Sequence, residues 1–274
     1  MKEIENGHFI NTVPLVAVVW LLMMLGCTST ALAQKPASIL VVSIDALVPE
    51  ALGDETSPFI SELMRQGVYS LDGMSVDPPL TLVSHAAMVT GLAPNKGGRL
   101  DNDWSPGEST VPGKTVFHAA KTAGYRTGFF YAKQKLGYLV SSDVDEYELS
   151  AFPTDDALEF VRKGSSFTFV HISGLDQVGP EFGWLSKEYL EELGYIDEYL
   201  KPLVEAVRSQ GEYRIIILSD HGGHEKLHGC GHPEDFRIPI IVLQSQPLIN
   251  PTDLKGFTTD GLSTLVTKVM ANSR

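Results

Sequence analysis

The stretch "SILVVSID" at residues 38–45 decides the fold of this chain. It is an unbroken apolar run, rich in β-branched residues, that ends in the carboxylate of Asp45. Such a run is typical of a strand buried on both faces of a sheet. Two later apolar runs also lead into an aspartate: "FTFVHIS" (167–173), followed by Asp176, and "YRIIILSD" (213–220), which ends in Asp220. The sequence therefore predicts three buried strands that each deliver a carboxylate from their carboxyl end.

Helical segments alternate with these strands along the chain. Apolar residues at helical spacing, with starts and stops at Ser, Thr, Asp, Pro and Gly, predict helices. The expected helices span 57–67, 83–91, 115–124, 154–164, 186–210 and 260–271, and further strands span 125–132 and 237–244. This alternation, without a repeat or a linker, predicts one α/β domain around a mainly parallel sheet. Ligands bind beyond the carboxyl ends of such strands, so we expect the three aspartates to lie close together.

The N-terminus carries an export signal. The apolar run "VPLVAVVWLLMMLGC" (13–27) has the length of a signal-peptide core, and Ala31-Leu32-Ala33 is typical of a cleavage site. We expect a signal peptide at residues 1–33, one domain at 34–274, and a periplasmic or secreted protein. The alternatives are a retained membrane anchor and a lipoprotein processed at Cys27. After cleavage no membrane span is expected, and Cys230 has no second cysteine in the domain to form a disulfide with.

The negative net charge of the chain argues against one class of partner, the nucleic acids. The formal net charge is −13, and nucleic-acid polymers are bound by clustered Lys and Arg. We therefore expect no nucleic-acid polymer as a partner. A small anionic substrate held by metal ions remains compatible with an acidic chain. The sequence leaves the oligomeric state open.

Residues 219–232, "SDHGGHEKLHGCGH", hold four of the eight histidines of the chain. Carboxylate and imidazole together suit divalent metals such as zinc, and Asp220 and His221 lie in this stretch. The alternative is an exposed turn, which the glycines of the stretch also fit. A single Asp after a strand can likewise be a helix cap.

The segment "PPLTLVSHAAMVTG" (78–91) places a hydroxyl residue, Thr81, before a predicted helix. The N-terminus of a helix presents free N–H groups and suits a phosphate. A Thr hydroxyl becomes a useful nucleophile only when a metal or a base lowers its pKa. The alternative is ordinary N-capping by Thr81 or Ser84.

Several of these motifs occur together in one known superfamily. The chain resembles the alkaline phosphatase superfamily, most closely its bacterial nucleotide pyrophosphatase/phosphodiesterase-like branch, over residues 38 to 270. The matching motifs, in order, are "SIDAL", "TLVSHAAMVTGLAP", "DND" (101–103), "FVHISGLDQVGPEFGWLSKEYL", "SDHGGHEKLHG" and "HPEDFRIPIIV". The resemblance implies an alkaline-phosphatase-like three-layer sandwich with a mainly parallel central sheet, and we expect a small cap within residues 99–153.

The resemblance also implies two zinc ions bridged by a phosphate. One zinc would be bound by Asp45, Thr81, Asp220 and His221. The other would be bound by Asp176, a histidine four residues later, and His228. Thr81 would be the nucleophile, and Asn102 would donate a hydrogen bond to a non-bridging phosphate oxygen.

The sequence departs from this pattern at one ligand. The stretch "DQVGPEFG" (176–183) has Pro180 where the second zinc should find its histidine. Proline offers no side-chain ligand, so the second site is expected to be impaired unless Glu181, His224 or His232 replaces it. The other domain histidines, His85, His118 and His171, are expected to be structural.

These observations lead to one expected function and several alternatives. We expect an exported, metal-dependent phosphodiesterase or nucleotide pyrophosphatase that acts on a small phosphate ester or nucleotide. The alternatives are a phosphomonoesterase of the same superfamily and a degenerate member that binds a phosphate ligand without turnover. A sulfatase is less well supported, because position 81 is neither Cys nor Ser and the downstream Arg of that motif is absent.

Overall fold

The structure of the chain is a computed structural model that describes residue 1 and residues 36–271. Apart from Met1, the expected signal peptide and Cys27 lie outside the described residues. The described residues 36–271 belong to one compact unit. None of the helices within the described residues has the length and apolar content to cross a membrane.

The centre of the domain is a seven-stranded sheet with the order β2-β7-β6-β1-β5-β3-β4. Strand β7 runs opposite to the other six strands of this sheet, so the predicted mainly parallel sheet is confirmed. The strands are β1 (Ser38–Ile44), β2 (Val68–Met74), β3 (Arg126–Tyr131), β4 (Glu146–Leu149), β5 (Ser166–Ile172), β6 (Tyr213–Leu218) and β7 (Arg237–Gln244).

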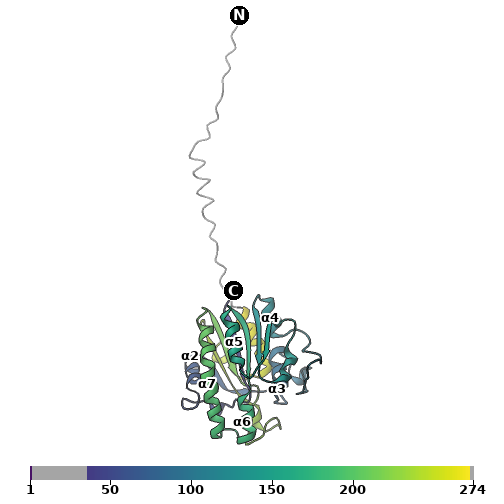
Figure 1. Cartoon of the computed structure of the whole chain (residues 1–274), viewed down its shortest axis with the longest axis vertical. Coiled ribbons are helices and arrows are strands. Elements are labelled where there is room, and N and C mark those ends of the chain that lie inside the picture. Colours follow the sequence, from purple (N-terminus) through teal and green to yellow (C-terminus); the bar gives the residue numbers. More distant parts are fainter. Residues whose placement is uncertain (2–35, 272–274) are drawn as a thin grey trace. The chain divides into compact units, whose positions relative to one another are not determined.

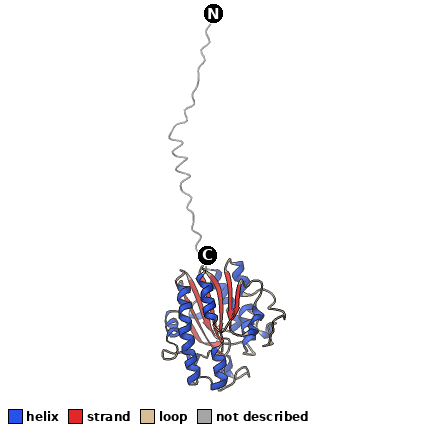
Figure 2. Cartoon of the chain, viewed as in Figure 1, coloured by secondary structure: helices blue, strands red, loops and turns tan. Residues whose placement is uncertain are grey.

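Helices lie on both faces of this sheet, which makes three layers (Figures 1 and 2). They are α2 (Pro58–Gln66), α3 (Thr81–Thr90), α4 (Val116–Thr122), α5 (Pro153–Arg162), α6 (Gly174–Phe182), α7 (Lys187–Arg208), α8 (Pro233–Phe236) and α9 (Leu262–Ala271), with a 3-10 helix η3 (Gln134–Leu139). The predicted helices are confirmed to within a few residues; α6 and α8 were not expected.

The alternation of side chains along β1 explains why its sequence is apolar throughout. Ile39 and Val41 pack into the core under α3, α4 and α9, whereas Leu40 and Val42 pack under α2, α5 and α7. All of these residues are almost completely buried. Burial of one such side chain contributes about 1.5–3 kcal/mol, so a strand covered on both faces is a strong anchor for the residues that follow it.

Strands β2 and β4 lie at the two edges of the sheet and were not expected. The side chains of β2 are mostly half-buried or exposed, and all four residues of β4 are exposed. They therefore lack the apolar run that marks the central strands. The range 99–153, expected to include a small cap, contributes α4, β3 and β4 to the body of the domain.

The N-terminus of α2 is held by a carboxylate from another helix. The cap residue Ser57 makes no side-chain capping bond. Instead, the carboxylate of Asp197 on α7 accepts hydrogen bonds from the N–H groups of Phe59 (2.9 Å) and Ile60 (2.7 Å). Asp197 is 1% exposed, so it joins two helices on the same face of the sheet through a buried contact.

We predict that Asp197→Ala lowers the free energy of unfolding by about 2 kcal/mol, because two helix N–H groups lose their acceptor. Urea denaturation of the domain measures this loss. Asp197→Asn keeps an acceptor oxygen and should lose less. Glu198→Ala removes a neighbouring carboxylate with 66% exposure and should change stability by less than about 0.5 kcal/mol. Equal losses for the Asp197→Ala and Glu198→Ala variants would rule out the capping role.

Candidate active site

Four neighbouring strands deliver charged side chains to one edge of the sheet. In the order β3, β5, β1 and β6, the residues that follow the strands are Lys133, Asp176, Asp45 and Asp220. The predicted convergence of the three aspartates is thus present in the structure, and a lysine joins them.

Two of the carboxylates have one oxygen held by the protein and one oxygen free. Asp220 Oδ1 accepts hydrogen bonds from the backbone N–H groups of Ala46 (3.1 Å) and His221 (3.0 Å). Asp45 Oδ2 lies 2.9 Å from His171 Nε2. The remaining oxygens, Asp220 Oδ2 and Asp45 Oδ1, are buried without a hydrogen-bond partner. Because unpaired buried carboxylate oxygens are costly, these two atoms indicate a place for a cation.

His221 completes this first ligand group. Its Nδ1 donates to the carbonyl oxygen of Gly222 (2.8 Å), which leaves Nε2 facing the carboxylates. Nε2 lies 3.2 Å from Asp45 Oδ1 and 3.7 Å from Asp220 Oδ2. These three ligand atoms lie within 4.8 Å of one another, and two carboxylates with one imidazole suit zinc. The residues present therefore fit one divalent metal.

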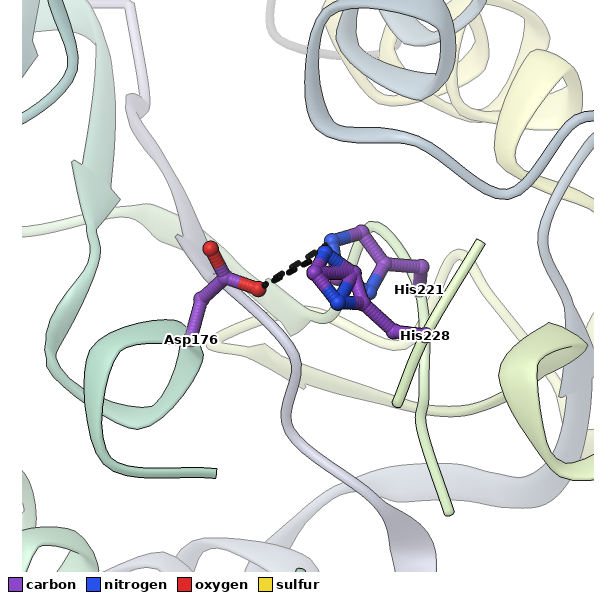
Figure 3. A group of neighbouring side chains, drawn as sticks. All are labelled: Asp176, His221 and His228. Carbon is purple, nitrogen blue, oxygen red and sulfur yellow. Dashed lines mark ion pairs between the residues drawn. The ribbon is translucent and has the colours of Figure 1, made fainter. Parts of the chain in front are cut away.

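The second ligand group overlaps with the first. Asp176 Oδ1 lies 3.3 Å from His228 Nε2 and 3.7 Å from His221 Nε2, and Figure 3 shows both imidazoles beside this carboxylate. The two imidazole rings are stacked with centroids 4.7 Å apart. Since the single Nε2 lone pair of His221 binds one metal, a separate second ion would keep only Asp176 and His228. That is fewer than the three protein ligands of a catalytic zinc site.

None of the three expected replacements for the missing histidine joins this group. Pro180 lies inside α6. Glu181 belongs to no metal-ligand group of the described residues. His224 Nδ1 is bound to Asp235 at 2.7 Å, and its ring stacks on that of His232. The residues around Asp176 and His228 therefore do not fit a second zinc beside the first, although His224, Cys230 and Asp235 form a separate possible ligand group away from this cluster.

Thr81 is the first residue of α3, and the residue at the cap position is Leu80. The Thr81 side chain does not serve as the cap of this helix. It is 3% exposed, and its Oγ1 accepts a hydrogen bond from Lys133 Nζ at 3.2 Å. Asn102 Oδ1 accepts the N–H of Leu82 at 2.9 Å, which places the free amide group of Asn102 beside the start of α3.

Sequence reasoning missed the roles of Lys133 and His171. His171 is fully buried; its Nδ1 accepts the N–H of Ala132 (3.3 Å), so Nε2 carries the proton donated to Asp45. Lys133 lies two residues after the end of a buried strand, a position similar to that of Asp45 after β1. His85 Nδ1 is bound to the Thr81 carbonyl at 2.7 Å and lies 3.5 Å from Asp220 Oδ2, and His118 is paired with Asp143 at 3.2 Å; the structural roles expected for both stay predictions.

Two glycines let the histidine loop pack closely. A Cβ on Gly222 would lie 2.2 Å from the carbonyl oxygen of Glu234, and one on Gly223 would lie 2.2 Å from the Trp184 ring. Neither glycine has a positive φ. The alternative of an exposed turn is therefore wrong for Gly222 and Gly223, which are buried where the backbone passes through a crowded region, but it agrees with the half-buried Gly229 and the exposed Gly231, whose φ values are 70° and 85°.

The buried charges shift the pKa values of the ligands. Burial and the neighbouring Asp45 carboxylate raise the pKa of Asp220 to about 7. Burial lowers the pKa of His221, but Asp220 and Asp45 outweigh this effect and raise it to about 10. Burial lowers the pKa of His85 to about 3, so His85 is neutral. Without a metal, protons therefore compensate the charge of this group.

We predict that zinc binding displaces these protons. At pH 8 mainly His221 is protonated, and at pH 6 Asp220 is protonated as well. The affinity for Zn²⁺ should therefore fall about tenfold for each unit by which the pH is lowered near pH 8. It should fall more steeply below pH 7, because each displaced proton contributes a factor of about ten per pH unit. Calorimetric titration in buffers of different ionisation enthalpy measures the number of protons released. Asp220→Asn should lose the additional release at pH 6, and a zinc affinity that does not change with pH would contradict the assignment.

Comparison with known proteins identifies the family. Residues 39–229 match the family described as type I phosphodiesterase / nucleotide pyrophosphatase. A GPI ethanolamine phosphate transferase 1 of Neurospora crassa is 26% identical over 218 residues, which cover 68% of this chain and 22% of that protein. The chain thus spans about a fifth of the length of this relative. The expected bacterial branch is not confirmed, since the similar curated proteins are fungal.

Solved structures support the fold. A 2-O GAG sulfatase superposes with a TM-score of 0.69 at 15% identity, over 86% of this chain and 71% of that one. Murine ectonucleotide pyrophosphatase / phosphodiesterase 5, in complex with AMP, superposes with a TM-score of 0.58 at 18% identity, over 68% of this chain and 57% of that one. These similarities agree with the alkaline-phosphatase-like architecture inferred from the sequence. With the family match over most of its length, this chain belongs to the type I phosphodiesterase / nucleotide pyrophosphatase family.

Proposed function

We propose that this chain is a metal-dependent phosphoric ester hydrolase of the phosphodiesterase or nucleotide pyrophosphatase type, with Thr81 as its nucleophile. One observation carries the proposal. The buried Thr81 hydroxyl shares the Lys133 ammonium with Asp45, whose Oδ1 is one of the unpaired buried oxygens around His221. The hydroxyl group of Thr81, the proposed nucleophile, thus lies beside unpaired oxygens that can bind a cation.

The proposed reaction has two displacements at phosphorus. Thr81 Oγ attacks the phosphorus, the bond to the leaving oxygen breaks, and the hydroxyl proton passes to water. Water then attacks the phosphothreonine, and Thr81 Oγ leaves and regains a proton. A zinc ion held by Asp45, Asp220 and His221 would supply Lewis acidity that lowers the pKa of the Thr81 hydroxyl.

Two features of the chain suit the phosphate itself. The start of α3 directs the positive end of the helix dipole to the region of Thr81. The amide N–H of Asn102 is available as a donor, because its Oδ1 already accepts from Leu82. We propose that Asn102 donates to a non-bridging oxygen of the phosphate, and that the substrate is a small phosphate ester or nucleotide.

The fungal relatives favour a second candidate, transfer of a phosphoethanolamine group. The first displacement would be the same, and a hydroxyl acceptor would replace water in the second. Phosphorus NMR of the products in the presence of glycerol distinguishes the two. With a phosphodiester as substrate, a phosphate monoester as the main product supports the hydrolase, and a new phosphodiester of glycerol supports the transferase.

We predict that Thr81→Ala, assayed with saturating zinc, lowers the turnover of bis-p-nitrophenyl phosphate at least about 100-fold, since the attacking oxygen is removed. Thr81→Ser should keep part of the activity. Thr90→Ala, at the other end of the same helix, should leave the rate unchanged. Full activity in the Thr81→Ala variant would exclude this nucleophile.

The preferred substrate follows from a comparison of rates. Turnover of p-nitrophenyl phosphate above that of the diester would favour the phosphomonoesterase alternative. No turnover of either ester by a zinc-loaded wild type would favour the degenerate member that only binds a phosphate ligand.

We also propose that the protein is exported by cleavage after Ala33, on the strength of the apolar run at residues 13–27 and the Ala31-Leu32-Ala33 sequence. The intact mass of the protein recovered from a secreting host tests this. A mass that corresponds to residues 34–274 is expected, and a mass that retains residues 1–33 would contradict it.

A further inference from the structure

Lys133 lies at the centre of the carboxylate cluster. Its Nζ lies 2.5 Å from Asp45 Oδ2, forms a short contact with Asp176 Oδ2, and donates to Thr81 Oγ1 at 3.2 Å. The side chain is 19% exposed. An ammonium group has three N–H donors, and here three different elements of the fold supply one acceptor each.

The cluster has two distinct sides. Asp45 Oδ1 and Asp176 Oδ1 face the histidines and have no hydrogen-bond partner, whereas Oδ2 of both residues faces Lys133. The lysine therefore bridges one carboxylate from each of the two ligand groups. In a two-metal site of this family these same carboxylates would bind different ions.

Pro180 lies one helical turn after Asp176, on the same face of α6. A ligand at position 180 would thus approach the metal that Asp176 binds. This ligand is missing, and the Oδ2 atom of Asp176 is bound to an ammonium instead. The carboxylate of Asp176 therefore lacks a neighbouring metal ligand at position 180 and at the same time binds a buried lysine.

Charge balance agrees with one metal and one lysine. Asp45, Asp176 and Asp220 carry three negative charges, and one divalent ion together with Lys133 carries three positive charges. Two divalent ions with Lys133 would leave an excess of two positive charges in a buried cluster, which is unfavourable.

We propose that Lys133 takes the place of the second metal ion, so that this cluster binds one divalent cation and the chain supplies the second positive charge itself. In this arrangement Lys133 is a catalytic residue, since it contacts the attacking oxygen of Thr81. Its ammonium stabilises the negative charge that develops on the reacting oxygens. This role in turnover rests on the proposed function, whereas the number of metal ions does not.

The number of bound metal ions tests the inference directly. All proteins, including the otherwise wild-type chain, carry Cys230→Ser, which removes the thiol of the separate His224, Cys230 and Asp235 group. They are loaded with excess Zn²⁺, desalted, and measured by elemental analysis. About one zinc per chain is expected for the wild type, for Lys133→Met and for Pro180→His, and about two for the Pro180→His/Lys133→Met double variant, in which a third ligand is restored and the ammonium is absent. Two zinc ions in the wild type or in Pro180→His, or one in a folded double variant, would overturn the proposal.

A charge-preserving variant separates the effect of charge from that of folding. Pro180→His/Lys133→Arg keeps a cation in the cluster and should remain at about one zinc, with a far-UV circular dichroism spectrum like that of the wild type. If this variant binds two ions, a positive charge at position 133 does not exclude the second metal, and the proposal fails.

Turnover gives a second and separate measurement. Lys133→Met should lower kcat about 100-fold with one zinc still bound, and Lys133→Arg should retain part of the rate. Lys135→Met, a lysine two residues further along, should leave kcat unchanged. An unchanged kcat in Lys133→Met would overturn the catalytic role. An inert wild type would overturn the proposed function, but the zinc counts would still decide the role of Lys133 in metal binding.

Discussion

Three carboxylates buried together at one edge of a sheet need positive charge, and the rest of the site depends on this requirement. Moving even one such group out of water costs several kcal/mol when nothing compensates it. Asp45 and Asp220 are completely buried, and Asp176 is largely so. Two features of the structure meet this requirement. The ammonium of Lys133 lies on one side of the carboxylates, and on the other side oxygens and imidazole nitrogens are arranged so that they can bind a metal.

The sheet makes this concentration of charge possible. Apolar side chains on both faces of β1 hold the strand so firmly that the residues after it have little freedom. The backbone then adds specific contacts. Ala46, with a φ of 63°, donates to Asp220, and its carbonyl oxygen accepts the hydroxyl of Tyr189 at 2.7 Å. Thr81 reaches the same edge because α3 begins at this residue.

The sequence was most informative where apolar periodicity and charge coincide. The runs that became β1, β5 and β6 could be recognised because strands buried on two faces must be apolar throughout, and the aspartates after them marked the ligand edge. The edge strands β2 and β4 lack that pattern, because most of their side chains are half-buried or exposed to solvent. Lys133 could not be assigned from the sequence, because a lysine after a strand is ordinarily solvated; its burial depends on the positions of Asp45 and Asp176, which only the fold brings together. Pro180 marked the absence of one expected ligand, but the sequence could not show that Lys133 lies against the carboxylate of Asp176.

The order of the strands also bears on how the molecule folds. Strand β1 pairs with β5 and β6, whose partner residues lie more than 120 positions later in the chain. Pairing over such distances closes large loops, and chains dominated by such contacts fold slowly. During synthesis β1 has neither neighbour until most of the domain has been made. Asp45 and Asp220 therefore meet late, and a partly made chain that still lacks β6 does not yet contain the place for a cation.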